Sequence, residues 1–193
     1  MTAPIHFYYD VASPYSYLSA HRLVEMDAQA DVEVHWRPIL LGGIFRATGN
    51  TMPAAVPAKA RYLLDDLARW ALRDRIPFHY SSSFPHNSLL AMRVLSAAQP
   101  DTLVELSMRL FRAAWVDDRN ISEESVIHEV LGPDFEGLLM ETQNPIVKDC
   151  LKQTTQEAID NGAFGAPAFM VNNTLFWGND RLDMAVDYAV SLA

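Results

Sequence analysis

Residues 7–16 have the sequence Phe7-Tyr8-Tyr9-Asp10-Val11-Ala12-Ser13-Pro14-Tyr15-Ser16. Its first part, with Ile5 ahead of it, is short and rich in aromatic and β-branched residues, which is typical of a buried strand. Ser13-Pro14 then predicts a helix start, because Ser is favoured at the N-cap and Pro at the first helical position. The stretch therefore predicts a buried strand over 5–11 that runs directly into a helix, which we expect to reach about Ala28.

A second strand is predicted by the alternating residues 32–36, and it should end near Pro38-Ile39. The two strands and the helix between them form a β-α-β unit, whose crossover is expected to be right-handed. Residues 40–56 carry Gly and Pro without a clear period, so we predict a loop there.

The middle of the chain has the periodicity of helices for about a hundred residues. Its apolar stripes are Tyr62, Leu63, Leu67, Trp70 and Ala71; Leu89, Leu90, Val94 and Leu95; and Leu103, Leu106, Leu110 and Ala114. Short helices are predicted to begin near Ser122 and Asp134. A longer helix should open at Asn144-Pro145, continue through Ile159 and stop at Asn161-Gly162.

Strands return after the helical region, over residues 168–171 and 174–177. They flank Asn172-Asn173, a two-residue hairpin turn in which Asn tolerates a positive φ. A last helix is predicted over 180–192. The order β-α-β, helices, β-β-α predicts an α/β protein with a thioredoxin-like fold and an all-helical insertion. We assign residues 1–55 and 163–193 to the thioredoxin-like domain and 56–162 to the insertion.

Ser13 is the first candidate for chemistry. A hydroxyl at the N-cap lies where free N–H groups and the helix dipole favour an anion, so it could hold a foreign thiolate and lower the thiol pKa. In a thioredoxin-like layout Ser13 and Ser16 occupy the places of the two redox cysteines, which excludes dithiol chemistry. Ser16 is the weaker candidate, and a plain capping role for Ser13 stays open beside the functional one.

Two segments near the C-terminus supply the remaining candidates. Pro167 is predicted to be cis, and Ala166 would then present its backbone N–H and C=O to a peptide at the thiol site. Asp180 and Arg181 suit the ammonium and carboxylate of an amino-acid head group. An ordinary turn and a surface ion pair remain the simpler interpretations of these residues.

Composition limits the classes of partner. The chain has 193 residues, with 15 basic and 24 acidic side chains and a net charge of −9, which argues against nucleic acid or an anionic membrane. One cysteine excludes an internal disulfide, and six histidines without ligand spacing predict no metal site. With no signal peptide and no long apolar stretch in the sequence, we expect a cytoplasmic protein.

The chain also resembles a known family. The segments that carry the resemblance are Ser13-Pro14-Tyr15-Ser16-Tyr17-Leu18, Thr48-Gly49-Asn50, Lys59 with Tyr62-Leu63, Gly162-Ala163-Phe164-Gly165-Ala166-Pro167 and Trp177-Gly178-Asn179-Asp180-Arg181. They are similar to kappa-class glutathione transferases and 2-hydroxychromene-2-carboxylate isomerases. The resemblance implies a homodimer that binds glutathione.

The same resemblance implies a role for each matching residue. Ser13 would be the catalytic serine that hydrogen-bonds the glutathione sulfur, and Ala166, followed by Pro167, would pair with the cysteinyl backbone. Asp180 and Arg181 would bind the γ-glutamyl group. Asn50 and Lys59 would lie near the peptide backbone and the glycyl end, a role that the residue patterns alone do not suggest.

The resemblance implies a glutathione-dependent cis–trans isomerase of aromatic catabolism, in which a thiolate adds to a conjugated 2-oxo acid, a bond rotates and the thiolate leaves. Residues 177–181 are similar to the isomerases, whereas 42–46 are similar to the transferases. Phe45 falls at or beside the isomerases' substrate-binding lysine, which Arg46 could replace. The alternatives are a kappa-class transferase that conjugates electrophiles or reduces peroxides, and a non-catalytic glutathione- or peptide-binding module.

Overall fold

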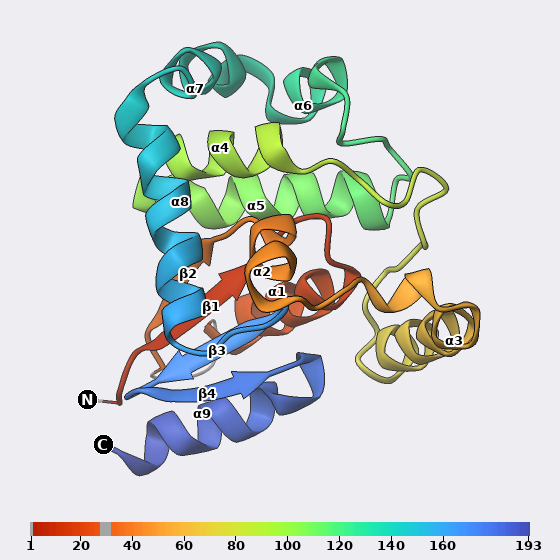
Figure 1. Ribbon diagram of the computed structural model, residues 1–193, viewed down its shortest axis with the longest axis vertical. Coiled ribbons are helices and arrows are strands. Elements are labelled where there is room, and N and C mark those ends of the chain that lie inside the picture. The colour runs from red at the N-terminus through yellow and green to blue at the C-terminus, as the bar shows by residue number, and fades with distance from the viewer. Residues whose placement is uncertain (1, 28–31) are drawn as a thin grey trace.

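A computed structural model describes residues 2–27 and 32–193 of the chain (Figure 1). Its centre is a four-stranded sheet with the order β2-β1-β3-β4. The strands are β1 (Ile5–Tyr9), β2 (Val34–Pro38), β3 (Ala168–Val171) and β4 (Thr174–Trp177). Strand β1 pairs parallel with β2 and antiparallel with β3, and β3 pairs antiparallel with β4.

The helices follow the predicted order around this sheet. They are α1 (Pro14–Asp27), α2 (Leu41–Thr48), α3 (Pro57–Arg73), α4 (Leu89–Ala97), α5 (Pro100–Trp115), α6 (Glu124–Leu131), α7 (Phe135–Glu141), α8 (Pro145–Asp160) and α9 (Leu182–Ser191). Single 3-10 turns occur at η1 (Pro53–Ala55), η2 (Gly132–Asp134) and η3 (Asn179–Arg181). Figure 1 shows α4 to α7 together at the top of the view and α8 descending from them to the sheet.

Alternation along β1 divides the interior into two apolar clusters. Phe7 and Tyr9 belong to the larger cluster, with side chains of α1, α5 and α9, whereas Tyr8 belongs to the smaller one, with side chains of α2 and α8. Successive side chains of a strand point to opposite faces, so both faces of the sheet are covered. The burial of β1 on both faces explains why its sequence is almost continuously apolar.

The structure confirms the helix starts predicted at Ser13-Pro14 and Asn144-Pro145 and the turn predicted at Asn172-Asn173. Pro occupies the first turn of α3, α5 and α8, where its missing N–H has no helical acceptor to lose. Asn144 caps α8 by accepting a hydrogen bond from the Ile146 N–H. Asn172 and Asn173 have φ values of 44° and 63°, so the hairpin turn is confirmed.

The prediction of a loop over 40–56 was wrong. Residues 41–48 form α2, and a 3-10 turn follows at η1. The helix has no capping side chain of its own at Leu40, and it contains Gly42 and Gly43, which lower helix propensity. Tertiary contacts outweigh this weak local preference, because Ile44 is fully buried in the smaller apolar cluster.

The other boundaries differ from the predictions by a few residues. The last helix begins at Leu182 after the 3-10 turn η3 rather than at Asp180, and the helices expected near Ser122 and Asp134 begin at Glu124 and Phe135. Helix α1 is described to Asp27, and its expected end at residue 28 lies outside the described residues.

The architecture is a thioredoxin-like α/β fold in which a helical insertion separates the β-α-β and β-β-α parts, as predicted. The division into a thioredoxin-like domain of 1–55 and 163–193 and an insertion of 56–162 remains our proposal. None of the helices in the described ranges is both long and apolar enough to cross a membrane.

Candidate active site

Ser13 lies between β1 and α1 and makes two contacts through one hydroxyl. Its Oγ accepts a hydrogen bond from the Ser16 N–H at 3.1 Å, which is the geometry of an N-cap. The same hydroxyl donates its proton to the Ala166 carbonyl oxygen at 3.1 Å. With an exposed fraction of only 4%, Ser13 is a largely buried link between the start of α1 and the loop before β3.

The start of α1 favours an anion beside Ser13. The helix has 14 residues and no acidic residue in its first turn. Within the described ranges, the Tyr15 backbone N–H has no acceptor. An unpaired amide and the positive end of the helix dipole are the usual elements of an anion site.

The Tyr15 side chain links the start of α1 to α3. Its hydroxyl donates to the Asp66 carboxylate at 2.7 Å. Burial raises the pKa of Tyr15, and the negative charges of Asp66 and Asp180 raise it further. Tyr15 is therefore a neutral hydrogen-bond donor at physiological pH rather than a base.

The loop before β3 is held from two sides. The Ala166–Pro167 peptide bond is cis, as predicted, and the Gly178 N–H donates to the Pro167 carbonyl at 3.0 Å. A Cβ atom at Gly165 would lie 2.7 Å from the Trp177 Nε1 atom, so only glycine leaves room for that indole. The sequence Gly165-Ala166-Pro167 thus lets Trp177 pack closely over the residue before Ala166.

Asn50 reaches the same loop from the end of α2. Its Nδ2 donates to the Phe164 carbonyl at 2.7 Å, and its Oδ1 accepts from the Thr51 N–H at 2.8 Å. The Phe164 ring lies 4.6 Å from the Trp177 ring, and both side chains are partly exposed. Asn50 therefore contacts the chain two residues before Ala166, beside the exposed aromatic pair of Phe164 and Trp177.

The other predicted residues are more loosely arranged. Asp180 and Arg181 form an ion pair with a 3.2 Å separation between Oδ2 and Nη2, and each side chain is about half exposed. Asp180 is close enough to Tyr15 to raise its pKa. Lys59 is exposed in the first turn of α3 and has no hydrogen bond or ion pair with any described residue.

The structure shows where Ser16 and Arg46 lie, the two residues whose roles the sequence left undecided. Ser16 is fully buried, and its Oγ has no hydrogen-bond partner among the described residues. Arg46 is exposed on α2, two residues after the buried Ile44 and therefore on nearly the opposite side of that helix.

Asp10 is a polar residue of this region that sequence reasoning missed. Its side chain is 1% exposed, and its Oδ1 and Oδ2 each accept a hydrogen bond at 2.9 Å, from the N–H groups of Ala12 and Leu41. The pKa of the Asp10 carboxyl is raised, because the effect of burial is larger than the opposing effects of these two bonds and of the Ser88 side chain. A carboxylate that directly follows a buried strand was the signal available in the sequence.

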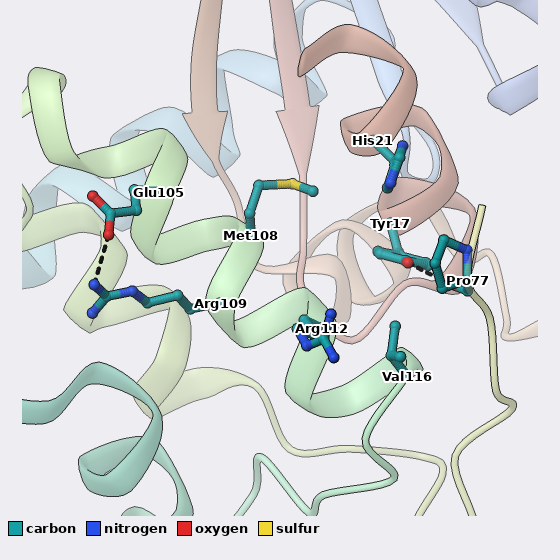
Figure 2. A pocket seen from close by; sticks show the side chains of 8 residues that line it. All are labelled: Tyr17, His21, Pro77, Glu105, Met108, Arg109, Arg112 and Val116. Atoms are coloured by element: carbon teal, nitrogen blue, oxygen red, sulfur yellow. Dashed lines mark hydrogen bonds and ion pairs between the residues drawn. The ribbon is translucent and has the colours of Figure 1, made fainter. Parts of the chain in front are cut away.

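A cavity of about 360 Å³ lies elsewhere, between α1 and α5 (Figure 2). Figure 2 shows its lining, which is Tyr17, His21, Pro77, Glu105, Met108, Arg109, Arg112 and Val116. The Tyr17 hydroxyl donates to the Pro77 carbonyl at this cavity. None of the predicted site residues is among these, so the cavity is separate from the Ser13 region.

Comparisons with known proteins agree with this architecture. A family model described as the DSBA-like thioredoxin domain matches residues 4–189. The 2-hydroxychromene-2-carboxylate isomerase of Sphingobium xenophagum is 29% identical, over 97% of this chain and 98% of that protein. Glutathione S-transferase kappa 1 of Homo sapiens is 32% identical, over 93% and 88%. A solved structure of a 2-hydroxychromene-2-carboxylate isomerase has a TM-score of 0.83 and 25% identity, over 97% and 95%.

Proposed function

Because this chain belongs to the DSBA-like thioredoxin domain family, together with the 2-hydroxychromene-2-carboxylate isomerases and the kappa-class glutathione transferases, we propose that it is a glutathione-dependent isomerase. The observation that carries the proposal is the Ser13 hydroxyl, which caps α1 and contacts the Ala166 carbonyl. A redox member of this fold would need two cysteines there, and this chain has two serines.

The residues present fit a peptide thiol. Ser13 and the Tyr15 N–H, which has no acceptor among the described residues, supply donors at the start of α1 for a thiolate. When bound, glutathione would supply a thiolate that adds reversibly to a conjugated substrate, so that a double bond becomes a single bond that rotates. The role of Ser13 is to hold the sulfur in its ionised form at that position, not to attack the substrate.

The Ser13 proton must change its acceptor for this role. In the structure that proton points to the Ala166 carbonyl, while the oxygen accepts the Ser16 N–H. A hydroxyl has a single proton, so donation to a sulfur releases the Ala166 carbonyl. That carbonyl is then free to accept an amide N–H from the bound peptide, which suits a cysteinyl residue within a peptide better than a simple thiol.

The remaining contacts are assigned by resemblance and supported by position. Asp180 and Arg181 offer opposite charges to the γ-glutamyl ammonium and carboxylate. Asn50 lies beside the Ala166 loop, and the exposed Lys59 is assigned to the glycyl carboxylate. The neighbouring Phe164–Trp177 pair offers an apolar surface to a small aromatic substrate.

The test is an ultraviolet difference titration of glutathione against pH, read in the thiolate band, with wild type and Ser13→Ala. We expect the bound thiol pKa to lie about one to two units below its free value in wild type and to return toward it in the variant. Turnover should fall on the order of 10- to 100-fold, since each pKa unit corresponds to about 1.4 kcal/mol. Glutathione binding should largely persist.

The matched control is Ser16→Ala. It removes a buried hydroxyl that has no partner in the described structure, one turn along the same helix. It should leave the thiol pKa unchanged, whereas Ser13→Ala also loses an N-cap worth about 1 kcal/mol of stability. Equal turnover in wild type and Ser13→Ala would remove Ser13 from the mechanism.

A kappa-class transferase is the second candidate, favoured by the 32% identity to the human enzyme. It would use the same thiol site to conjugate electrophiles or to reduce peroxides. Activity toward a chlorinated nitroarene without isomerase turnover would select it. Glutathione binding without a lowered thiol pKa would instead favour a non-catalytic glutathione- or peptide-binding module.

We further propose that the protein is a cytoplasmic homodimer, as the resemblance to glutathione-binding enzymes implies. Light scattering coupled to size-exclusion chromatography measures the mass directly, and the monomer mass is 21.7 kDa. A particle of about that mass at micromolar concentration would exclude a stable dimer.

A further inference from the structure

Asp10 connects two separate parts of the chain, the loop that carries Ser13 and helix α2, at the base of the thiol site. Its Oδ1 accepts the Ala12 N–H of the loop that carries Ser13, and its Oδ2 accepts the Leu41 N–H of α2. The Ser88 side chain, directly before α4, lowers the pKa of this carboxyl. Buried polar groups of this kind are retained where every bond is made, so we infer that Asp10 organises the region around it.

The bond to Leu41 supplies what α2 lacks. The residue before that helix is Leu40, whose side chain cannot cap it. The Asp10 carboxylate, directly after β1, occupies the position of a missing capping group and lies at the positive end of the helix. The start of α2 is therefore stabilised by a residue 31 positions earlier in the chain.

The other end of α2 reaches the loop before β3. The helix ends at Thr48, its C-cap residue Gly49 has a φ of 70°, and Asn50 then donates to the Phe164 carbonyl. Ala166, two residues farther on, accepts the Ser13 proton. Hydrogen bonds thus join Asp10 to the start of α2, Asn50 after the end of α2 to the loop before β3, and that loop to Ser13.

Other contacts fasten the Ser13 loop without joining it to α2. The Val11 N–H lies 3.4 Å from the Met92 Sδ, and the Trp115 Nε1–H donates to the Val11 carbonyl at 2.8 Å. Both partners come from α4 and α5, on the other side of the loop. These two contacts hold Val11 in place but do not reach α2. The Asp10 carboxylate is the group that bonds both the Ser13 loop and the start of α2.

We propose that Asp10 is a positioning residue of the thiol site, which sets the placement of the Ser13 hydroxyl relative to Asn50 and the Ala166 loop. The proposal rests on the proposed function for its chemistry, since a misplaced hydroxyl matters only where it serves a bound thiol. Its structural part, the capping of α2 by Asp10, holds independently of any ligand.

The first test replaces Asp10 by Asn, which keeps the shape but turns one acceptor into a donor that faces a backbone N–H. We expect glutathione affinity to fall on the order of tenfold and the bound thiol pKa to move toward its free value. Hydrogen exchange of the amides in 43–48 should become faster. The control is Tyr9→Phe, which deletes a buried hydrogen bond to Ser107 on the neighbouring residue without touching the loop or α2.

A second pair of variants tests the same hydrogen bond from its donor side, so that the proposal can still be tested if Asp10→Asn does not fold. Leu41→Pro deletes the N–H that Asp10 accepts, together with the leucine side chain. The substitution is at a first helical position where Pro is favoured, and it follows a residue whose φ and ψ of −101° and 104° suit it. Leu41→Ala loses the same side chain but keeps the N–H. We expect the Pro variant to lose affinity and amide protection relative to the Ala variant.

The outcomes separate the two proposals. If wild type binds glutathione with a lowered thiol pKa and both test variants match their controls, the positioning role of Asp10 is overturned. If wild type itself does not lower the thiol pKa, the proposed function fails, and the exchange of the α2 amides alone decides whether Asp10 caps that helix. Faster exchange in Asp10→Asn and Leu41→Pro supports the capping, and unchanged exchange refutes it.

Discussion

His86 makes part of the protein's stability dependent on pH. Its ring lies edge-on to Trp115 with centroids 5.6 Å apart, and only 8% of the residue is exposed. Burial lowers the pKa of His86 below the ordinary 6.5, although Asn120 and Asp118 act in the opposite direction. Between the folded pKa and 6.5 the unfolded chain therefore binds more protons than the folded one, so stability decreases as pH falls through this range.

The replacement His86→Phe should reduce that decrease, because Phe keeps an aromatic ring against Trp115 and cannot be protonated. Urea unfolding at pH 7, 6 and 5 measures the free energy of unfolding in each protein. Burial also lowers the pKa of His6, so the double variant with His6→Gln should show a still smaller decrease. An equal decrease in wild type and His86→Phe would refute the assignment.

Single residues also show what a sequence reveals about a site. The N-cap position of Ser13 was predictable because a serine directly before Pro14 is a local signal of a helix start. Asp10 was not, since its partner Leu41 becomes a neighbour only when the β-α-β unit has formed. Lys59 was suggested by resemblance alone, and the described structure gives it no partner that would distinguish it from any exposed lysine.

Helix α2 is the element whose stability is most open to change. Gly42 lies inside it, and a Cβ atom there would meet nothing within 4 Å. Gly42→Ala should therefore stabilise the protein by about 0.5 kcal/mol, because glycine loses more backbone freedom on folding than alanine. Gly43→Ala is the matched control: its Cβ would lie 3.2 Å from the Thr155 Cγ2 of α8, so the crowding should cancel the gain. Urea midpoints of the two variants provide the comparison.

The same helix explains why the 40–56 prediction failed. Sequence patterns detect helices through their own caps and apolar stripes, and α2 has a leucine at its N-cap position and one fully buried side chain, Ile44. Its stability comes from Asp10 at its start and from packing on α8. Helix α8, by contrast, carries its own cap in Asn144, and its predicted start coincided with the observed one.

At the scale of the whole molecule, the order of elements was predictable and the extent of their mutual packing was not. Strand and helix periods, with Pro and Asn at their ends, were sufficient to predict β-α-β, a helical insertion and β-β-α. They could not show that the insertion completes the core of the sheet. Tyr9 of β1 packs against Phe111 of α5 with ring centroids 5.8 Å apart, and its hydroxyl bonds the Ser107 hydroxyl of α5 at 2.6 Å.

This shared core predicts that the thioredoxin-like part and the insertion unfold together. One apolar cluster extends from Phe7 and Phe169 in the sheet through α5 to Leu131 in α6. Leu110→Ala, at a fully buried position of α5, should therefore cost about 2–5 kcal/mol and lower the denaturation midpoint of the entire protein. Far-UV circular dichroism and tryptophan fluorescence should report coincident transitions in wild type and variant, because neither part can keep its packing without the other. Two separate transitions, with only one of them shifted in Leu110→Ala, would instead identify 56–162 as a domain that folds independently.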